Sequence, residues 1–204
     1  MGIRAASILS AAAAALAATF PAVAGDPSTA AQEMIKRDFK PRGIATIDRV
    51  NQDGVQMLCN RSHDKPPKDI AERLEKDQLS GIQWPADGKL LGDWKSGERI
   101  AQSGQGGQYN DDPKRPSGAN CYACHQLTKE ELSYGTIGPS LHNFAKLRGY
   151  GPDIQKYAWN KVYNSHAFAA CSSMPRFGYR GILTEQQIKD VVALLMDPNS
   201  PVNK

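Results

Sequence analysis

The clearest hydrophobic pattern in this chain lies near the C-terminus. Four apolar residues fall there at positions i, i+3, i+4 and i+7: Ile188, Val191, Val192 and Leu195. Thr184 and Gln187 form a capping box ahead of them, and Pro198 follows them. Because these signals mark one apolar face with a start and a stop, we predict a helix over residues 184–196.

Weaker apolar patterns predict four more helices, over residues 29–39, 68–79, 90–103 and 152–163. Pro67 suits the first turn of the second of these, and Gly104 ends the third. Residues 41–58 are predicted to be loop and short extended pieces, residues 133–147 to be mostly turns, and residues 104–120 and 171–181 to be loops. Any strand is expected to be minor, so the pattern indicates an all-α fold.

The first 24 residues have the pattern of a secretory signal peptide. Arg4 is the only charge before Asp26, an Ala/Leu-rich run covers residues 8–20, and an A-x-A cleavage pattern stands at 22–24. The apolar run is too short for a membrane span, so an uncleaved anchor is the weaker alternative. We therefore predict export to the periplasm, where disulfides form.

Charge and hydropathy exclude two classes of partner. The formal net charge is +4, but the basic residues form no dense run of the kind that binds nucleic acid. After the signal peptide, no segment is apolar enough to be expected to cross a bilayer. We therefore expect no nucleic-acid partner and no membrane span in the mature chain.

The feature that carries chemistry is residues 121–125, Cys-Tyr-Ala-Cys-His, which read as C-x-x-C-H. Thiols at Cys121 and Cys124 can each add to a vinyl group of haem, and His125 can then bind the iron. A zinc site needs two more ligands at matching spacing, and a redox dithiol does not need the histidine. The pattern therefore indicates one covalently attached haem c, and electron transfer is the leading function.

The second axial ligand decides whether the iron passes electrons or binds small molecules. Met174 is the leading candidate, because Pro175 rigidifies the chain beside its sulfur. Phe177 and Tyr179 follow in the same loop and can exclude water from the iron. His166 is the fallback, and it implies a lower reduction potential. Packing or hydrogen-bonded roles are expected for the other three candidates: Met196, His142 and His63.

A glycine–proline pair lies 13 and 14 residues beyond His125, at Gly138 and Pro139. The carbonyl of Pro139 can accept the N–H of the proximal imidazole, which would fix the ring and increase its basicity. A simple turn without a contact to the haem site is an equally good interpretation.

Two cysteines remain outside the motif, Cys59 and Cys171. In an oxidising compartment an even remainder suggests a disulfide, which would close a loop of about 110 residues and contribute up to ~4–5 kcal/mol. Because Cys171 lies three residues before Met174, the bond would clamp the ligand loop to the N-terminal part of the chain. Free thiols and a bond to another subunit remain alternatives.

The order of these elements resembles that of class I cytochromes c. This family has a first helix with a glycine, C-x-x-C-H, a G-P-x-L turn, a methionine loop and a C-terminal helix. The corresponding elements here are Gly97, residues 121–125, residues 138–141, residues 174–175 and residues 184–196. The resemblance covers residues 90–198 and implies that Gly97 lets the terminal helices cross closely. We expect a signal peptide at 1–24, an N-terminal extension at 25–89 and a cytochrome c domain at 90–204.

The extension and the long loop before the motif resemble SoxX, the family of monohaem subunits of the SoxAX cytochromes of thiosulfate oxidation. Four stretches carry this resemblance: residues 92–98, 120–126, 134–141 and 173–178. It implies a periplasmic heterodimer with a SoxA-like monohaem or dihaem cytochrome that holds the catalytic haem. Such a complex joins thiosulfate oxidatively to a cysteine of a SoxYZ-like carrier, an L-cysteine S-thiosulfotransferase reaction. The implied role of this chain is to pass electrons to a small soluble cytochrome c, with no catalytic residue and no activity by itself.

Two other functions are open. A free-standing periplasmic class I electron shuttle explains the haem motif but gives the extension no role. A ligand-binding or peroxidase-type enzyme predicts an open iron, and its dihaem class needs a second C-x-x-C-H, which the sequence lacks. A complex subunit should cover an apolar patch with its partner, and three aromatic residues are candidates for it, although core packing is as common: Trp84, Trp94 and Tyr109.

Overall fold

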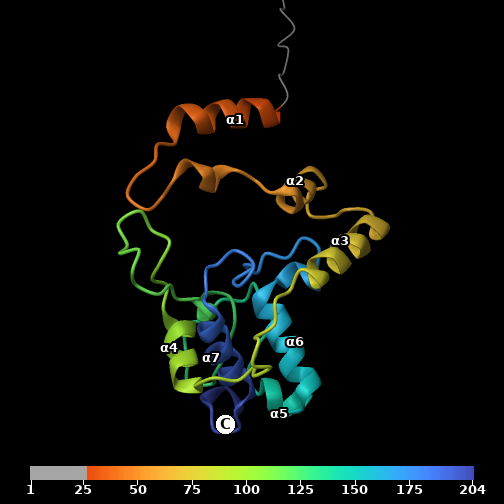
Figure 1. Cartoon of the computed structure of the whole chain (residues 1–204), viewed down its shortest axis with the longest axis vertical. Coiled ribbons are helices and arrows are strands. Elements are labelled where there is room, and N and C mark those ends of the chain that lie inside the picture. The colour runs from red at the N-terminus through yellow and green to blue at the C-terminus, as the bar shows by residue number, and fades with distance from the viewer. Residues whose placement is uncertain (1–26) are drawn as a thin grey trace, which may run out of the picture. The chain divides into compact units, whose positions relative to one another are not determined.

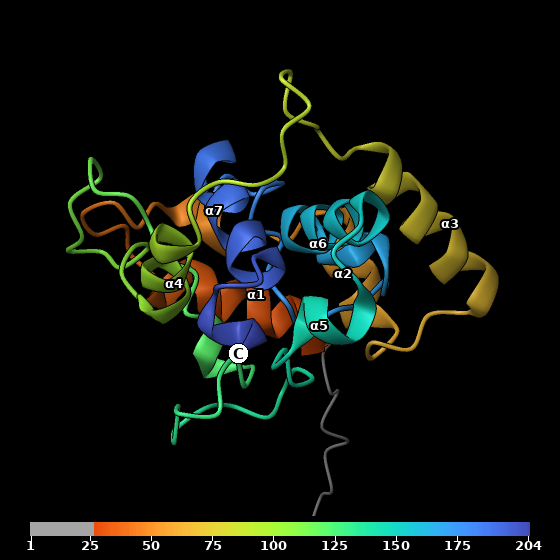
Figure 2. The ribbon, with the colours of Figure 1, turned by 90° about the horizontal axis from the view of Figure 1, so that it is seen from below.

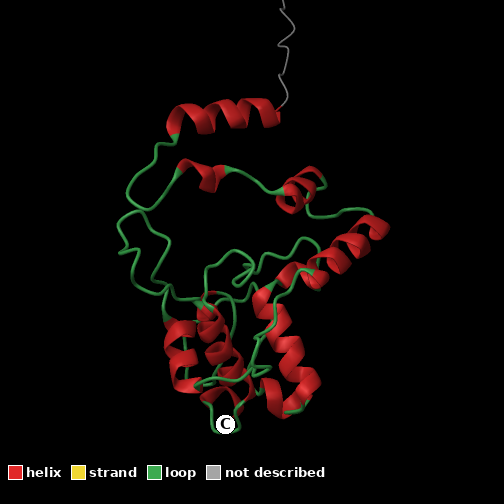
Figure 3. Cartoon of the chain, in the orientation of Figure 1, coloured by secondary structure: helices red, strands yellow, loops and turns green. Residues whose placement is uncertain are grey.

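The computed structural model describes residues 27–204, and within that range the chain is helical (Figure 3). The described residues form seven α-helices: α1 (Pro27–Asp38), α2 (Gly54–Arg61), α3 (Lys68–Ser80), α4 (Trp94–Gln102), α5 (Phe144–Arg148), α6 (Pro152–Tyr163) and α7 (Glu185–Met196). Short 3₁₀ helices occupy Ile47–Val50, Cys121–Ala123, Ser165–Ala167 and Pro201–Asn203. The described residues contain no strand beyond an isolated bridge between Arg42 and Ala45, which confirms the all-α prediction. The predicted signal peptide lies outside the described residues.

All five predicted helices are present, with ends displaced by up to four residues. Two short helices, α2 and α5, lie in segments that were predicted to be irregular. In α2 the only buried residue is Cys59, so no apolar stripe announces the helix. Its start does carry a local signal, because Asp53 and Gln56 form a complete capping box.

Residues 40–204 form one compact unit, and α1 belongs to a separate unit that ends at Phe39. Most of the predicted extension, from residue 40 onward, therefore shares a unit with the predicted cytochrome c domain. Ile82 and Leu90 join the apolar core, and the indole nitrogen of Trp159 donates to the carbonyl of Gln83 at 3.1 Å. The predicted division at residue 89/90 stays a prediction.

The core is built around α7, which is buried from Ile188 to Met196. Figures 1 and 2 both show α4 alongside α7, and α6 also packs on α7. A Cβ placed at Gly97 of α4 would overlap the carbonyl oxygen of Asp190, so only glycine allows the two helices to approach this closely. The role predicted for Gly97 is thus confirmed by the packing.

In the described part of the chain, no helix combines the length and the apolar character needed to cross a membrane.

Candidate haem site

The C-x-x-C-H segment forms a tight turn at the edge of the core. Asn120 adopts a left-handed conformation with φ +47°, which asparagine tolerates better than most residues, and the chain then enters the 3₁₀ helix. The backbone N–H groups of Cys124 and His125 both donate to the carbonyl of Cys121, at 3.1 and 2.9 Å. This turn places the side chains of Cys121, Cys124 and His125 on the wall of one cavity.

That cavity has a volume of about 350 Å³ and fits an apolar cofactor. Its size lies within the ~300–1,000 Å³ typical of cofactor pockets. Apolar side chains from several elements line it, among them Leu141, Phe144, Phe177, Leu194 and Leu195. Burial raises the pKa of the Cys121 thiol to about 12, so this cysteine is a neutral thiol before any modification. Two free thiols, an imidazole and apolar walls in one cavity are the groups that a covalently attached haem needs.

The ring of His125 is fixed by the turn at Gly138 and Pro139. Its Nδ1 lies 2.7 Å from the carbonyl oxygen of Pro139, the contact anticipated from the sequence. Because a carbonyl oxygen only accepts, Nδ1 carries the proton and Nε2 is left with a free lone pair. A Cβ at Gly138 would overlap the imidazole, so glycine allows the turn to approach the ring. The arrangement orients His125 as a metal ligand.

Met174 lines the same cavity from the loop that connects the 3₁₀ helix Ser165–Ala167 to α7. Its carbonyl accepts a hydrogen bond from Oγ of Ser165 at 2.5 Å, and its N–H donates to Oγ of Ser172 at 3.2 Å. Phe177 is buried and lines the cavity, as expected. Tyr179 does not line it: its side chain is 46% exposed and lies against the guanidinium of Arg176. The water-excluding role predicted for Tyr179 therefore finds no support in this cavity, whose lining does not include it.

Of the candidate axial ligands, only His125 and Met174 line this cavity. His166 is buried, with its Nε2 3.1 Å from the carbonyl oxygen of Ser172, and it lines a different cavity. Burial, and secondarily the positive charge of Arg176, lowers the pKa of His166. The other three do not line the cavity: Met196 is in the packed core, His142 is partly buried and His63 is exposed. The assignment of Met174 as the second ligand stays a prediction that the geometry favours.

Two basic side chains also line the cavity, Arg148 and Lys161. Burial lowers the pKa of Lys161. Arg148 lies over the rings of Phe144 and Tyr157, at 5.2 and 6.0 Å from their centroids. The positive charges suit the two carboxylates that a haem carries.

A disulfide joins Cys59 of α2 to Cys171, and this is the pairing suggested by the sequence. The bond closes a segment whose ends are 112 residues apart in the chain. It attaches α2 directly to the loop that carries Met174. The structure thus contains the internal disulfide, and neither free thiols at these two positions nor a bond from them to another subunit.

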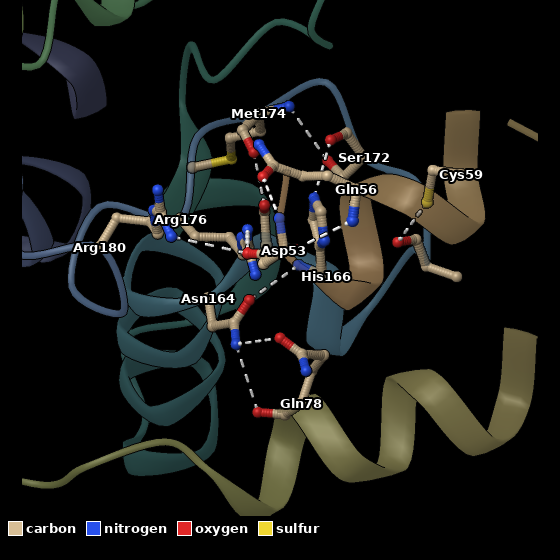
Figure 4. A network of polar contacts seen from close by, with 12 residues as sticks. Asp53, Gln56, Cys59, Gln78, Asn164, His166, Ser172, Met174, Arg176 and Arg180 are labelled. Carbon is tan, nitrogen blue, oxygen red and sulfur yellow. Dashed lines mark hydrogen bonds and ion pairs between the residues drawn. The ribbon is translucent and has the colours of Figure 1, made fainter. Parts of the chain in front are cut away.

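A second link between α2 and the same loop was missed by sequence reasoning. Figure 4 shows Arg176 pointing toward Asp53, with which it forms an ion pair, and Arg180 approaches the same carboxylate at 3.7 Å. Desolvation raises the pKa of the Asp53 carboxyl, but the N–H of Gln56 and the two guanidinium groups outweigh it, and the pKa is lowered. The capping box was visible in the sequence, whereas the pairing with Arg176 left no local signal.

Comparison with known proteins agrees with this geometry. Residues 114–197 match the family model of cytochrome c. An uncharacterized lipoprotein of Aquifex aeolicus (strain VF5) is 37% identical over 158 residues, which are 75% of this chain and 73% of that protein. The segment that matches the family model contains the C-x-x-C-H turn, Pro139, Met174 and α7, and these elements build the cavity.

Proposed function

This chain belongs to the cytochrome c family and carries a class I domain of that family, and we propose that it is a monohaem electron relay. In this proposal Cys121 and Cys124 hold one haem c through thioether bonds. His125 and Met174 would bind its iron. A haem bound there supplies a one-electron couple between ferric and ferrous iron. The observation that carries the proposal is the convergence of these four side chains on one apolar cavity.

The side chains around the cavity support a six-coordinate, electron-transferring site. Pro139 holds the proton on Nδ1 of His125, which leaves Nε2 available and increases its basicity. The thioether of Met174 favours the ferrous state and raises the reduction potential. The apolar walls, Phe177 among them, keep water away from the iron. A site filled in this way passes electrons and does not bind substrates.

The relay is proposed to serve a SoxAX-type complex as its electron-transfer subunit. The four stretches that resemble SoxX, and the extension they accompany, are the basis for this proposal. The use of cysteine supports it, because all four cysteines of the chain have a role: two in the haem motif and two in the disulfide. No thiol remains for sulfur transfer, so the L-cysteine S-thiosulfotransferase chemistry belongs to a SoxA-like partner acting on a SoxYZ-like carrier.

The proposed location is the periplasm. The predicted signal peptide leads to it, the disulfide fits an oxidising compartment, and the relative named as a lipoprotein is compatible with export. The electrons would leave to a small soluble cytochrome c. A free-standing periplasmic shuttle is the competing function, since the haem cavity is complete within one chain.

The test is the reduction of the haem in the mature protein after addition of thiosulfate and the thiol carrier. Two mixtures are compared, with and without the partner cytochrome, and a third without thiosulfate gives the background. Reduction that requires both the partner and thiosulfate supports a dedicated relay subunit. Equal reduction without the partner, or none in either mixture, leaves only the general electron shuttle.

A further inference from the structure

The loop that carries Met174 has a cavity on each side. Residues 172–175 line the haem cavity, and they also line a second cavity of about 1060 Å³. The walls of the second cavity come from the extension, from the long loop before Cys121 and from residues 171–182. Residues 172–175 therefore lie between the proposed haem site and the second cavity, and directed contacts from other elements help to hold them there.

Some of those contacts come from the cytochrome c domain itself. Ser165 holds the carbonyl of Met174, as described above, and the N–H groups of Gly178 and Tyr179 both donate to the carbonyl of Tyr163, at 3.1 and 3.0 Å. These bonds attach the middle and the end of the loop to the end of α6. On the side before Met174, Nε2 of His166 also lies 3.1 Å from the carbonyl oxygen of Ser172, and the N–H of Ala170 donates to the carboxylate of Glu75 in α3 at 2.9 Å.

Helix α2 and its N-cap residue add one contact on each side of Met174. Cys171, three residues before Met174, is bonded to Cys59, and Arg176, two residues after it, pairs with Asp53. Both attachment points belong to one rigid element, because Asp53 caps the helix of eight residues that contains Cys59. Helix α2 and its N-cap residue are therefore attached to the ligand loop at two points, the disulfide and the ion pair, and Figure 4 shows the second of these.

The ion pair between Asp53 and Arg176 is more than a surface contact. The Arg176 side chain is only 4% exposed, and its Nη1 has no hydrogen-bond partner among the described residues. Asp53 is the carboxylate that compensates this buried charge, and the centroid of the Tyr179 ring lies 4.8 Å from the guanidinium carbon. Removing one member of a buried pair leaves the other unpaired, which disfavours the closed arrangement far more than loss of an exposed pair does.

We propose that Asp53, acting through Arg176, is a positioning residue that keeps Met174 on the haem side of its loop. The inference rests on the proposed ligation by His125 and Met174. When Asp53 is neutral, the segment after Met174 is no longer drawn toward α2, and conformations with the sulfur withdrawn become more populated. An external ligand of the iron binds only to those conformations, so its apparent affinity reports their population.

The test compares Asp53→Asn with the wild-type holoprotein, using imidazole as the external ligand of the ferric iron. Asparagine caps helices as well as aspartate does, so α2 is retained and only the charge is removed. A hydrogen bond to a charged group is worth enough that imidazole should bind about 10–100-fold more tightly to the variant. The midpoint potential should fall as methionine ligation weakens. The control is Asp69→Asn, which removes an exposed ion pair with Arg73 in the same extension.

Unchanged imidazole affinity and potential in a folded Asp53→Asn protein would overturn the proposal, as would an equal change in Asp69→Asn. If Asp53→Asn does not accumulate, Arg176→Lys gives the same test, because lysine keeps the charge but loses the planar fork. The Arg176→Lys protein should also bind imidazole more tightly than the wild type does. An unchanged imidazole affinity would contradict the proposed positioning of Met174 through Asp53 and Arg176. If the spectrum of the wild-type holoprotein shows no methionine ligation, the proposed axial pair itself is refuted. Failure of the positioning role of Asp53 and failure of the proposed axial pair are therefore distinguishable.

Discussion

The carbonyl oxygen of Pro139 lies 2.7 Å from Nδ1 of His125 and accepts a hydrogen bond from it. This contact joins a turn 14 residues downstream to the ring that follows the two motif cysteines. It decides which nitrogen of the ring faces a metal, and it gives the imidazole part of the character of an anion. Gly138 makes it possible, because any side chain there would occupy the space of the ring.

Replacing Gly138 by alanine should displace the ring of His125 from Pro139. Loss of the hydrogen bond makes the imidazole a weaker electron donor, so the midpoint potential of the haem should rise, as redox titration can measure. Outer hydrogen bonds of this kind typically change metal affinity or activity about 10–100-fold, so a smaller fraction of chains should keep histidine ligation. Gly151→Ala is the matched control, because a Cβ there meets no atom within 4 Å. A potential identical to that of the control would contradict the expectation.

Replacing Met174 by alanine should remove the second axial ligand. The long-wavelength absorption band of a methionine-ligated ferric haem should disappear. The potential should fall by on the order of 0.1 V, within the ~0.8 V range that axial ligands span. Met196→Leu is the control, since Met196 is buried in the core and does not line the haem cavity. Retention of the wild-type ferric spectrum in Met174→Ala would rule out Met174 as the ligand.

Replacing Gly97 by alanine should destabilise the whole fold. The added methyl group would overlap the backbone of α7 at Asp190, and overpacking of this kind costs about 1–3 kcal/mol. Denaturant unfolding of the holoprotein measures the effect. Gly54→Ala, at a position with open space at the start of α2, should be neutral or stabilising by up to ~1 kcal/mol. Equal midpoints for Gly97→Ala and the wild type would show that α4 and α7 can separate without cost.

The ion pair at Asp53 should make the protein sensitive to acid. Desolvation raises the pKa of Asp53, but its bonds to Gln56 and Arg176 lower that pKa by more. The pKa of Asp53 in the folded protein therefore lies below the ordinary ~3.9. The Asp53 carboxylate then makes its full contribution to stability above pH ~3.9. This contribution is lost as the pH falls through the pKa that Asp53 has in the folded protein. Urea unfolding between about pH 6 and pH 3 should show a steeper loss for the wild type than for Asp53→Asn. Parallel curves for the two proteins would mean that this carboxylate does not stabilise the folded state.

Local signals account for the parts of the fold that were predicted correctly. The helix α7 has a period, a capping box and a following proline, all within 15 residues of one another, and each signal depends only on near neighbours. The motif at 121–125 and the turn at Gly138 likewise depend only on residues close together in the chain. The helix α2 was missed because it buries only Cys59 and so shows no apolar period.

By itself, the sequence determined the all-α character, the covalent haem motif, the place of α7 and a short set of candidate axial ligands, because those properties reside in spacing along the chain. Tertiary structure decided which distant residues meet. It placed Met174 and not His166 in the cavity of His125, joined Cys59 to Cys171, and turned Arg176 toward Asp53. The physical reason is that contacts between residues distant in the sequence depend on how the helices pack, and packing reflects the whole core, so no short segment can encode it.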